Sequence, residues 1–454
     1  MSTLSNLQEL RSKIEEGSID TVIVAFPDHL GRLMGKQVTG WYFLDYMVES
    51  GMHACDYLLS VDMEMNPQSG FDMAGWDKGY GDFHGVVDMH TLRPVPWLSA
   101  TAMVLCDLQW ENGNPVVESP RSILRRQIER AAERGFSLLT ASELEFYLFD
   151  QPPKVISENG LTALRPSSEY SIDYHLLQTS ADEPLIREIR NSMGGARIPV
   201  EFSKGEWGSG QHEINIRYSD ALETADRHAI YKNGVKEIAA NRGYSATFMA
   251  KQNAESAGSS CHLHVSLFEI DSENNLFWDK SNGQETALFR NFLGGVLTYS
   301  SDYFLFLAPT INSYKRYQPS TFAPTAIAWS RDNRTTGYRI VGREASFRIE
   351  NRMPGADANP YLALAATIAA GLAGIDEELD CGEPYKGNAY VDAVLPRVPQ
   401  SLTTAANNIE SSDSAQKAFG AEVVNHYVRL ARLEQQAFDA AVTDWEQRRY
   451  FERI

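Results

Sequence analysis

Four short segments of the chain place charged side chains or imidazoles on one face of an expected β-strand. In residues 142–148, the two-residue period of a strand directs Glu143 and Glu145 to one side and three apolar residues to the other. Residues 211–217, 261–267 and 347–352 follow the same pattern. Their polar faces carry Glu213, Asn215 and Arg217, then His262, His264 and Ser266, and finally Arg348, Glu350 and Arg352. Glu206 precedes the second segment by one short, glycine-containing turn.

For any one of these segments, a half-buried strand with a solvated polar face is the simpler interpretation. Solvated faces, however, usually mix Lys, Thr, Ser and Gln, whereas these four faces concentrate Glu, His and Arg. If all four strands belong to one curved sheet, several carboxylates share a cavity, which requires cations to neutralise them. Carboxylate oxygens with at most one imidazole suit hard divalent ions, so the pattern predicts bound Mg²⁺ or Mn²⁺.

Several arginines accompany the acidic segments: Arg316, Arg334, Arg339, Arg348 and Arg352. Each could bind a phosphate or a substrate carboxylate through two parallel hydrogen bonds, or could pair structurally with Glu or Asp. Metal ions and arginines around one anion are typical of phosphoryl transfer. The chain has no P-loop and no Gly-x-Ser-x-Gly elbow, so neither a P-loop nucleotidase nor a serine hydrolase is indicated.

Composition excludes several other classes of protein. The 454 residues include 41 Lys and Arg against 60 Asp and Glu, a net charge of −19 that disfavours nucleic acids and anionic membranes. Acidic residues near the N-terminus do not fit a secretory signal, and no apolar stretch is long enough to span a bilayer. The four cysteines are widely scattered, as expected for reduced thiols. We therefore expect a cytoplasmic protein that binds neither nucleic acid nor membrane.

A polar turn at residues 111–115 suggests a domain boundary. We expect an N-terminal α+β domain over residues 1–112 and a second domain over 116–454, whose first helix begins at Ser119-Pro120. Residues 156–197 and 382–404 lack a clear period, and we expect both to be long loops over a site.

In these motifs the chain resembles the glutamine synthetase family along nearly its whole length. The segments that carry the resemblance are 142–146, Glu206 with 210–213, 258–264, 312–316, Asn333-Arg334 with Arg339, 348–352, and 358–361. The resemblance implies an α+β fold. It comprises an N-terminal β-grasp domain and a catalytic domain with a curved antiparallel sheet flanked by helices. It also implies a double-ring homo-oligomer, expected to be a dodecamer, with active sites between neighbouring subunits.

The resemblance further implies ATP-dependent amide formation on the γ-carboxylate of glutamate, with ATP as cosubstrate and two or three Mg²⁺ or Mn²⁺ ions per site. By position, Glu145, Glu206 and Glu213 would bind one metal ion, and Glu143, His262 and Glu350 a second. Glutamate would contact Gly258, Arg316, Arg334 and Arg352, of which Arg334 and Arg352 are also catalytic candidates. ATP would contact His264, Ser266, Arg339 and Arg348.

One position departs from the family pattern. In glutamine synthetases a glutamate that helps to hold ammonium lies six residues after the arginine of Asn-Ser-Tyr-Lys-Arg, and here that position is Phe322. A phenyl ring cannot accept a proton, but it packs against an alkyl chain or faces a cation. The pattern is similar to the γ-glutamyl amine ligases of the family, so Phe322 is expected in an amine pocket. Asp56, expected from an adjacent subunit, is the candidate base.

The predicted function is therefore a ligase that joins glutamate to a primary amine through γ-glutamyl phosphate, in amine assimilation or detoxification. Two alternatives remain open from sequence. The first is a glutamine synthetase that uses ammonia, with another residue in place of the lost acid. The second is a non-catalytic ring-forming protein, which would have no physical reason to retain six uncompensated acidic and imidazole groups.

Overall fold

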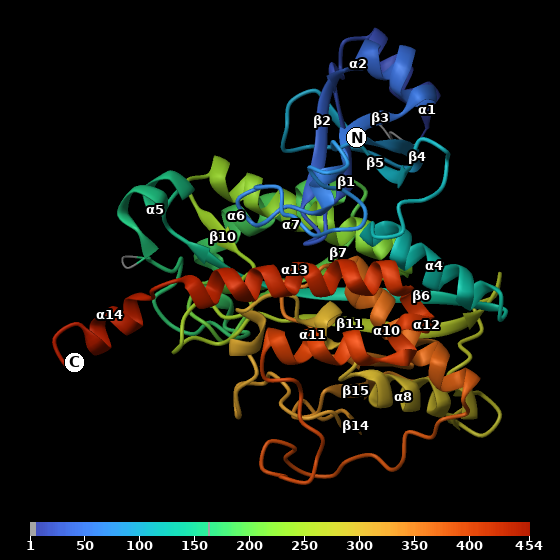
Figure 1. Ribbon diagram of the computed structural model, residues 1–454, viewed down its shortest axis with the longest axis vertical. Helices are drawn as coiled ribbons and strands as arrows, with labels where there is room; N and C mark the ends of the chain where they lie inside the picture. The colour runs from blue at the N-terminus through green and yellow to red at the C-terminus, as the bar shows by residue number, and fades with distance from the viewer. Residues whose placement is uncertain (1–5, 162–163) are drawn as a thin grey trace.

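The computed structural model describes residues 6–161 and 164–454, which form two large sheets with separate cores and one small two-stranded sheet. The N-terminal sheet has the order β2-β1-β5-β4-β3, with β1 and β5 parallel and every other pair antiparallel. Its strands are β1 (Thr21–Pro27), β2 (Leu33–Thr39), β3 (Met52–Cys55), β4 (Asp82–Pro94) and β5 (Thr101–Gln109). This unit lies at the top of Figure 1, above the larger unit.

Helical segments cover the N-terminal sheet. They are α1 (Leu7–Glu15), α2 (Gly40–Tyr42), a π-helical turn η1 (Phe43–Met47), α3 (Val48–Ser50) and a 3-10 turn η2 (Asp56–Leu59). Leu10 and Phe43 are fully buried against Val22 and Val24 of β1, so one apolar face of the sheet is closed by helices. This mixed sheet with its packed helices is the β-grasp arrangement that the sequence analysis expected.

The larger sheet carries the segments singled out in the sequence. Its order is β14-β15-β16-β11-β6-β8-β7, and the short strands β9 and β10 pair with β6 outside this path. The bounds are β6 (Phe136–Phe149), β7 (Val200–Gly205), β8 (Gln211–Ile216), β9 (Ser219–Asp220), β10 (Ser245–Thr247), β11 (Cys261–Glu269), β14 (Trp329–Arg331), β15 (Tyr338–Val341) and β16 (Arg348–Asn351). Every pair is antiparallel except β14 with β15, which is parallel.

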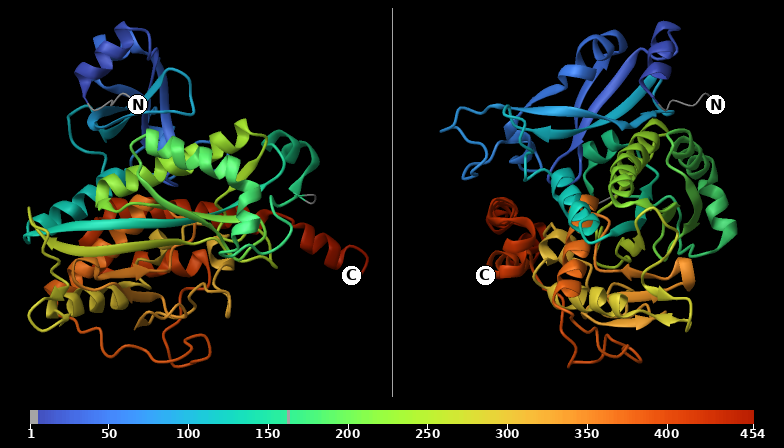
Figure 2. Two further views of the ribbon diagram at one scale, coloured as in Figure 1. Left: turned by 180° about the vertical axis from the view of Figure 1, so that it is seen from behind. Right: turned by 90° about the vertical axis from the view of Figure 1, so that its right-hand side faces the viewer.

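Helices flank this sheet, and the two views of Figure 2 show them stacked between it and the N-terminal unit and along its other side. They are α4 (Pro120–Ala132), α5 (Pro153–Asn159), α6 (Leu176–Gly195), α7 (Ala221–Asn241), α8 (Ala287–Tyr299), α9 (Phe304–Leu307), α10 (Pro360–Asp376), α11 (Leu402–Ser411), α12 (Asp413–Phe419), α13 (Ala421–Ala440) and α14 (Asp444–Tyr450). Short elements complete the chain: β12 (Trp278–Asp279) pairs with β13 (Gln284–Glu285), and 3-10 turns occupy η4 (Ser313–Lys315) and η5 (Glu344–Ser346).

The alanine-rich helix α10 lies at the centre of the larger core, and α8 packs closely against it. A methyl group added to Gly295 of α8 would lie 2.5 Å from the Cα atom of Gly374 in α10, so only glycines allow this approach. Among the described residues, no helix is long and apolar enough to cross a membrane.

The expectation of a long loop over residues 156–197 is wrong. This region contains the end of α5 and all of α6, a helix of 20 residues. Pro184 interrupts the helical pattern in the sequence, which hid the element. Leu185, Ile189 and Met193 of α6 are nonetheless buried in the larger core, so tertiary packing outweighs the weak local signal. Residues 382–401, by contrast, contain no helix or strand before α11 begins.

The two units are joined by a buried arginine. Arg121 of α4 is fully buried and pairs with Asp88 of β4 at 2.9 Å, Asp107 of β5 at 2.6 Å and Asp226 of α7 at 2.7 Å. The first two acids belong to the N-terminal sheet and the third to the larger unit. One guanidinium therefore compensates acids on both sides of the domain boundary.

We expect Arg121→Met to lower the free energy of unfolding by about 3–5 kcal/mol, because Asp226 would keep a buried, uncompensated charge. Arg125→Met is the matched control. Its side chain is 40% exposed and also pairs with Asp107, so its loss should cost less than about 1 kcal/mol. The urea midpoints of the two variants measure the difference. Equal midpoints would mean that Arg121 does not hold the domain boundary together.

Candidate active site

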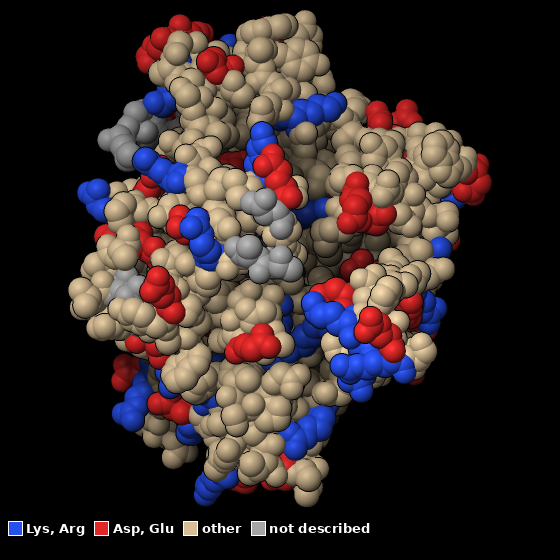
Figure 3. Space-filling model, turned by 90° about the vertical axis from the view of Figure 1, so that its left-hand side faces the viewer, with Lys and Arg blue, Asp and Glu red and all other residues tan. Residues whose placement is uncertain are grey.

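The charged faces of the larger sheet line one cavity of about 1370 Å³. Its walls come from β6, β7, β8, β11 and β15, and from the loops around residues 249–258 and 318–322. On the face drawn in Figure 3, a hollow opens with acidic atoms in its depth and Lys and Arg along its rim. The sheet thus gathers acids and bases from distant parts of the chain into one space.

The first acidic group contains Glu145, Glu206 and Glu213, with one oxygen from each lying within 4.8 Å of the others. Glu145 of β6 lies directly opposite Glu213 of β8, so both carboxylates leave the sheet on the same side. Glu206 follows the last residue of β7 in the turn that leads back to β8. The Ser260 amide donates to Glu145 at 2.8 Å and the Gln211 side chain donates to it at 3.1 Å, which fixes its orientation.

Burial and mutual repulsion hold this first group partly protonated. Burial, followed by the charge on Glu206, raises the pKa of Glu145 to about 8. Burial, followed by the charge on Glu143, raises the pKa of Glu213 to about 10. The cation nearest this group is Lys204, whose ammonium pairs with Glu206 and lies over the Tyr174 ring at 4.4 Å. Of the three acids, Lys204 pairs with Glu206 only, so among the described residues Glu145 and Glu213 have no salt bridge to Lys or Arg, and a bound cation would favour their ionised forms.

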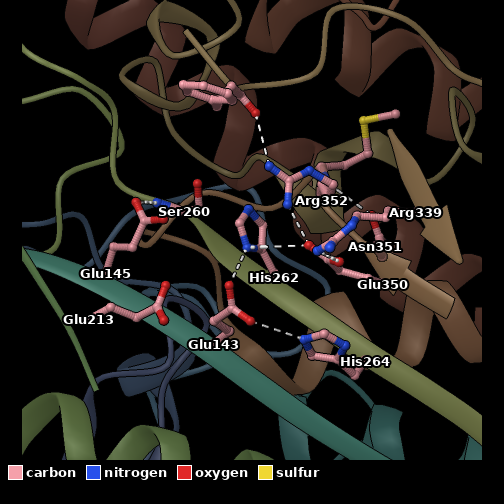
Figure 4. Close-up of polar contacts among 12 residues, drawn as sticks. Glu143, Glu145, Glu213, Ser260, His262, His264, Arg339, Glu350, Asn351 and Arg352 are labelled. Atoms are coloured by element: carbon pink, nitrogen blue, oxygen red, sulfur yellow. Dashed lines mark hydrogen bonds and ion pairs between the residues drawn. The ribbon is translucent and has the colours of Figure 1, made fainter. Parts of the chain in front are cut away.

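The second group contains Glu143, His262 and Glu350, whose ligand atoms also lie within 4.8 Å of one another. Figure 4 shows His262 between the two carboxylates. Its Nδ1 atom is 2.9 Å from Glu143 and 3.7 Å from Glu350. Its Nε2 atom is buried and has no hydrogen-bond partner among the described residues. The Nδ1 atom, which lies between two carboxylate oxygens, has the position of a metal ligand.

The second group is compensated by its neighbours. Burial opposes ionisation of Glu143, but hydrogen bonds from His262 and His264 hold its pKa well below the usual value. Burial also opposes ionisation of Glu350, yet His262 and Arg352 lower its pKa to about 2. Arg339 donates to one Glu350 oxygen at 2.9 Å and Arg352 donates to the other. This group therefore stays ionised without an added cation.

The structure separates the predicted anion-binding residues into those that line the cavity and those that lie behind it. Gly258, Arg334, Arg339 and Arg352 line it. Arg348, His264 and Ser266 are absent from its lining, and Arg348 Nε donates to His264 Nδ1 at 3.1 Å. The Ser266 hydroxyl donates to the Phe347 carbonyl at 3.2 Å.

Arg316 is also outside the lining, and its side chain is fully buried. It donates to the Met353 carbonyl at 2.9 Å, to the Ser260 hydroxyl at 2.8 Å and to the Arg352 carbonyl at 3.2 Å. A methyl group added to Gly258 would lie 2.8 Å from the Arg316 side chain, so the loop carrying Gly258 rests on this arginine. In this chain Arg316 supports the cavity wall from behind.

Phe322 lies on the cavity wall with 54% of its surface exposed. Its backbone is in the left-handed region, with φ of 60°, which is unusual for a bulky residue. Arg352 donates to its carbonyl at 3.3 Å, and its ring meets the ring of Trp207 edge-on with centroids 6.3 Å apart. No carboxylate occurs between Tyr317 and Trp329.

Asp56 does not line the cavity of its own chain. It begins η2 in the N-terminal unit, is buried, and accepts a hydrogen bond from the Gly81 amide at 2.9 Å. Burial raises its pKa. Within a single chain it is therefore not placed to act on a substrate in the cavity.

Sequence reasoning missed Lys204 and Trp207, both of which line the cavity. Lys204 lies two residues before Glu206 near the end of β7, so the strand period alone could have placed it beside the acids. Trp207 lies in the turn between β7 and β8, where no period indicates the direction of a side chain.

Comparison with known proteins agrees with this geometry. Residues 117–450 match the family described as "Glutamine synthetase, catalytic domain". The chain is 50% identical over 448 residues to gamma-glutamylethanolamide synthetase GlnA4 of Streptomyces coelicolor, covering 99% of this chain and 96% of that protein. It is 38% identical over 449 residues to glutamate–isopropylamine ligase of a Pseudomonas species, covering 98% of both.

Among solved structures, a GmaS/ADP complex superposes with a TM-score of 0.84 at 28% identity, covering 97% of this chain and 99% of that one. The fold, the two acidic groups and these matches lead to one conclusion. The chain belongs to the glutamine synthetase family.

Proposed function

We propose that this protein is an ATP-dependent ligase that joins the γ-carboxylate of glutamate to a primary amine. The observation that carries the proposal is the cavity itself. In it, the first acidic group, Glu143 and His262 of the second group, and three arginines face a wall that presents Phe322 instead of a carboxylate. The first two relatives above are named for products or substrates that contain an organic amine, which supports the same activity.

The reaction divides into two transfers. A γ-carboxylate oxygen of glutamate attacks the terminal phosphorus of ATP and ADP leaves, giving γ-glutamyl phosphate. The amine nitrogen then attacks the activated carbonyl, phosphate leaves and the nitrogen loses a proton. Arg334, Arg339 and Arg352 reach into the cavity and would hold the anions in the first transfer. The loop that carries Gly258 would form the wall beside glutamate, and the Arg316 side chain supports that loop.

Each acidic group has the donor set of a site for Mg²⁺ or Mn²⁺. Glu145, Glu206 and Glu213 would hold one ion, and Glu143, His262 and Glu350 another. Bound there, such ions screen the negative charge between two reacting anions and polarise the phosphoryl oxygens. With an ion bound to Glu206, the Lys204 ammonium would pair with Asp173 instead, whose carboxylate is 3.8 Å away.

An alkylammonium, with a pKa near 10, must lose protons before and after attack. Asp56 is too far inside its own N-terminal unit to accept them in the same chain. We therefore propose that Asp56 would act on the cavity of an adjacent subunit in a double-ring homo-oligomer. A dodecamer in the cytoplasm remains the expected assembly and location.

The substrate is tested by phosphate release with glutamate, ATP and a panel of amines: ammonium, ethanolamine, isopropylamine, putrescine and aniline. We expect kcat/KM for at least one short primary amine to exceed that for ammonium by about tenfold or more, because an apolar wall favours carbon over a bare ion. A wide preference for ammonium would establish a glutamine synthetase instead. No turnover with any amine would support the non-catalytic alternative.

Phe322→Glu should move the preference toward ammonium. A carboxylate at this position attracts a small cation and accepts its proton, so we expect kcat/KM for ammonium to rise and that for the best amine to fall by about tenfold. Phe322→Leu is the control, since it keeps an apolar wall of similar position. If Phe322→Glu and Phe322→Leu give the same amine-to-ammonium ratio, the ring does not set the preference.

Titration calorimetry with Mn²⁺ alone should detect at least two ions per chain. Glu213→Gln is expected to abolish or weaken one binding event at least about tenfold and Glu350→Gln the other, since each removes a ligand of a different group. Glu255→Gln is the control, because Glu255 lines the same cavity outside both groups. Binding should tighten as the pH rises, because carboxylates bind metal only after losing their protons. Unchanged isotherms in both ligand variants would contradict the assignment.

A further inference from the structure

Several large, exposed apolar side chains line this cavity. Tyr174, Phe202, Trp207, Met249 and Phe322 are all substantially exposed, and all line it. Aromatic rings that stay exposed to water in a concave site indicate a binding site for an organic ligand, because contact with the ligand removes their apolar surface from water. Of this set, Trp207 and Phe322 touch each other.

The position of Trp207 is fixed by a tight turn. The Glu206 amide donates to the Gln211 carbonyl at 2.9 Å, and the Gln211 amide donates to the Gly208 carbonyl at 3.0 Å. The Gly208 amide also donates to the Gln211 side chain at 2.9 Å. A methyl group on Gly208 would overlap the Tyr147 hydroxyl, at 2.0 Å, so the turn packs directly onto β6. Trp207, one residue after Glu206, is therefore held beside the first acidic group.

The position of Phe322 is fixed from the opposite wall. Its strained left-handed backbone is retained by the hydrogen bond from Arg352, whose other terminal nitrogen pairs with Glu350. The two rings meet at an interplanar angle of 60° with centroids 6.3 Å apart, which is an edge-to-face aromatic contact. Two segments separated by more than a hundred residues thus form one continuous aromatic surface.

We propose that Trp207 is a specificity-determining residue for the amine, and that with Phe322 it forms the surface against which the carbon chain of a short aliphatic primary amine lies. This inference rests on the proposed ligase function. The charged nitrogen of the amine would lie against the ring faces, which attract a cation. Because the rings touch, a long or bulky chain has no path between them, and the surface selects by length.

The test is a ladder of amines with the full-length enzyme: methylamine, ethanolamine, propylamine, hexylamine and putrescine. We expect Trp207→Ala to raise KM for ethanolamine and propylamine about tenfold, and to raise the ratio of kcat/KM for hexylamine over propylamine about tenfold. KM for glutamate and for ATP should stay within about twofold, since the change concerns the amine wall. Trp207→Phe should keep most of the wild-type order of kcat/KM values across this series of amines.

A double-mutant cycle tests the contact between the rings. Phe322→Ala should produce a similar change in the ladder, and Trp207→Ala with Phe322→Ala together should be less than additive, because either single variant already breaks the surface. Trp41→Ala is the control, since Trp41 is a similarly exposed tryptophan on the N-terminal unit and does not line the cavity.

An unchanged ladder in Trp207→Ala, with normal turnover, would overturn the inference while leaving the ligase function intact. If Trp207→Ala is inactive, the ladder measured for Trp207→Leu decides in the same way. A wild-type enzyme without amine-dependent turnover would instead overturn the proposed function itself, so the two failures are distinguishable.

Discussion

The crowding of carboxylates on one face of a sheet is the constraint on which this structure depends. The two acidic groups lie on adjoining strands of the same sheet but meet that constraint differently. Glu350 pairs with Arg339 and Arg352, and Glu143 accepts hydrogen bonds from two imidazoles, so the pKa values of both acids are lowered. The first group has only Lys204, and its acids keep protons instead. The first group is therefore the less compensated of the two.

Much of the site could be predicted because a strand has a fixed side-chain period. Glu143, Glu145 and Glu213 were assigned to common faces from sequence, and the registers of β6 with β8 and β11 bring those faces together. The general α+β architecture and the glutamine synthetase family were also confirmed. The assignment of individual ligand and substrate contacts stays a prediction, although the six proposed metal ligands do meet in two groups.

The rest could not be read from the sequence for identifiable physical reasons. The sequence predicts a loop where α6 lies because Pro184 breaks the local helical pattern, while packing of the buried residues of α6 stabilises the helix. Trp207 was missed because a turn has no period. The burial of Arg316 behind the cavity wall depends on carbonyls more than thirty residues away, which no local pattern encodes. In all three cases, tertiary contacts decide the structure and the local sequence does not.

The buried salt-bridge network around Arg121 also constrains how the protein can move. It connects the N-terminal sheet to α4 and α7. If the Arg121 guanidinium moved away from any one of its three acids, that acid would lose its ion pair. A hinge between the two units would have to break that network. The N-terminal unit is therefore held in one orientation on the larger unit, and any surface that it offers to another molecule is offered rigidly.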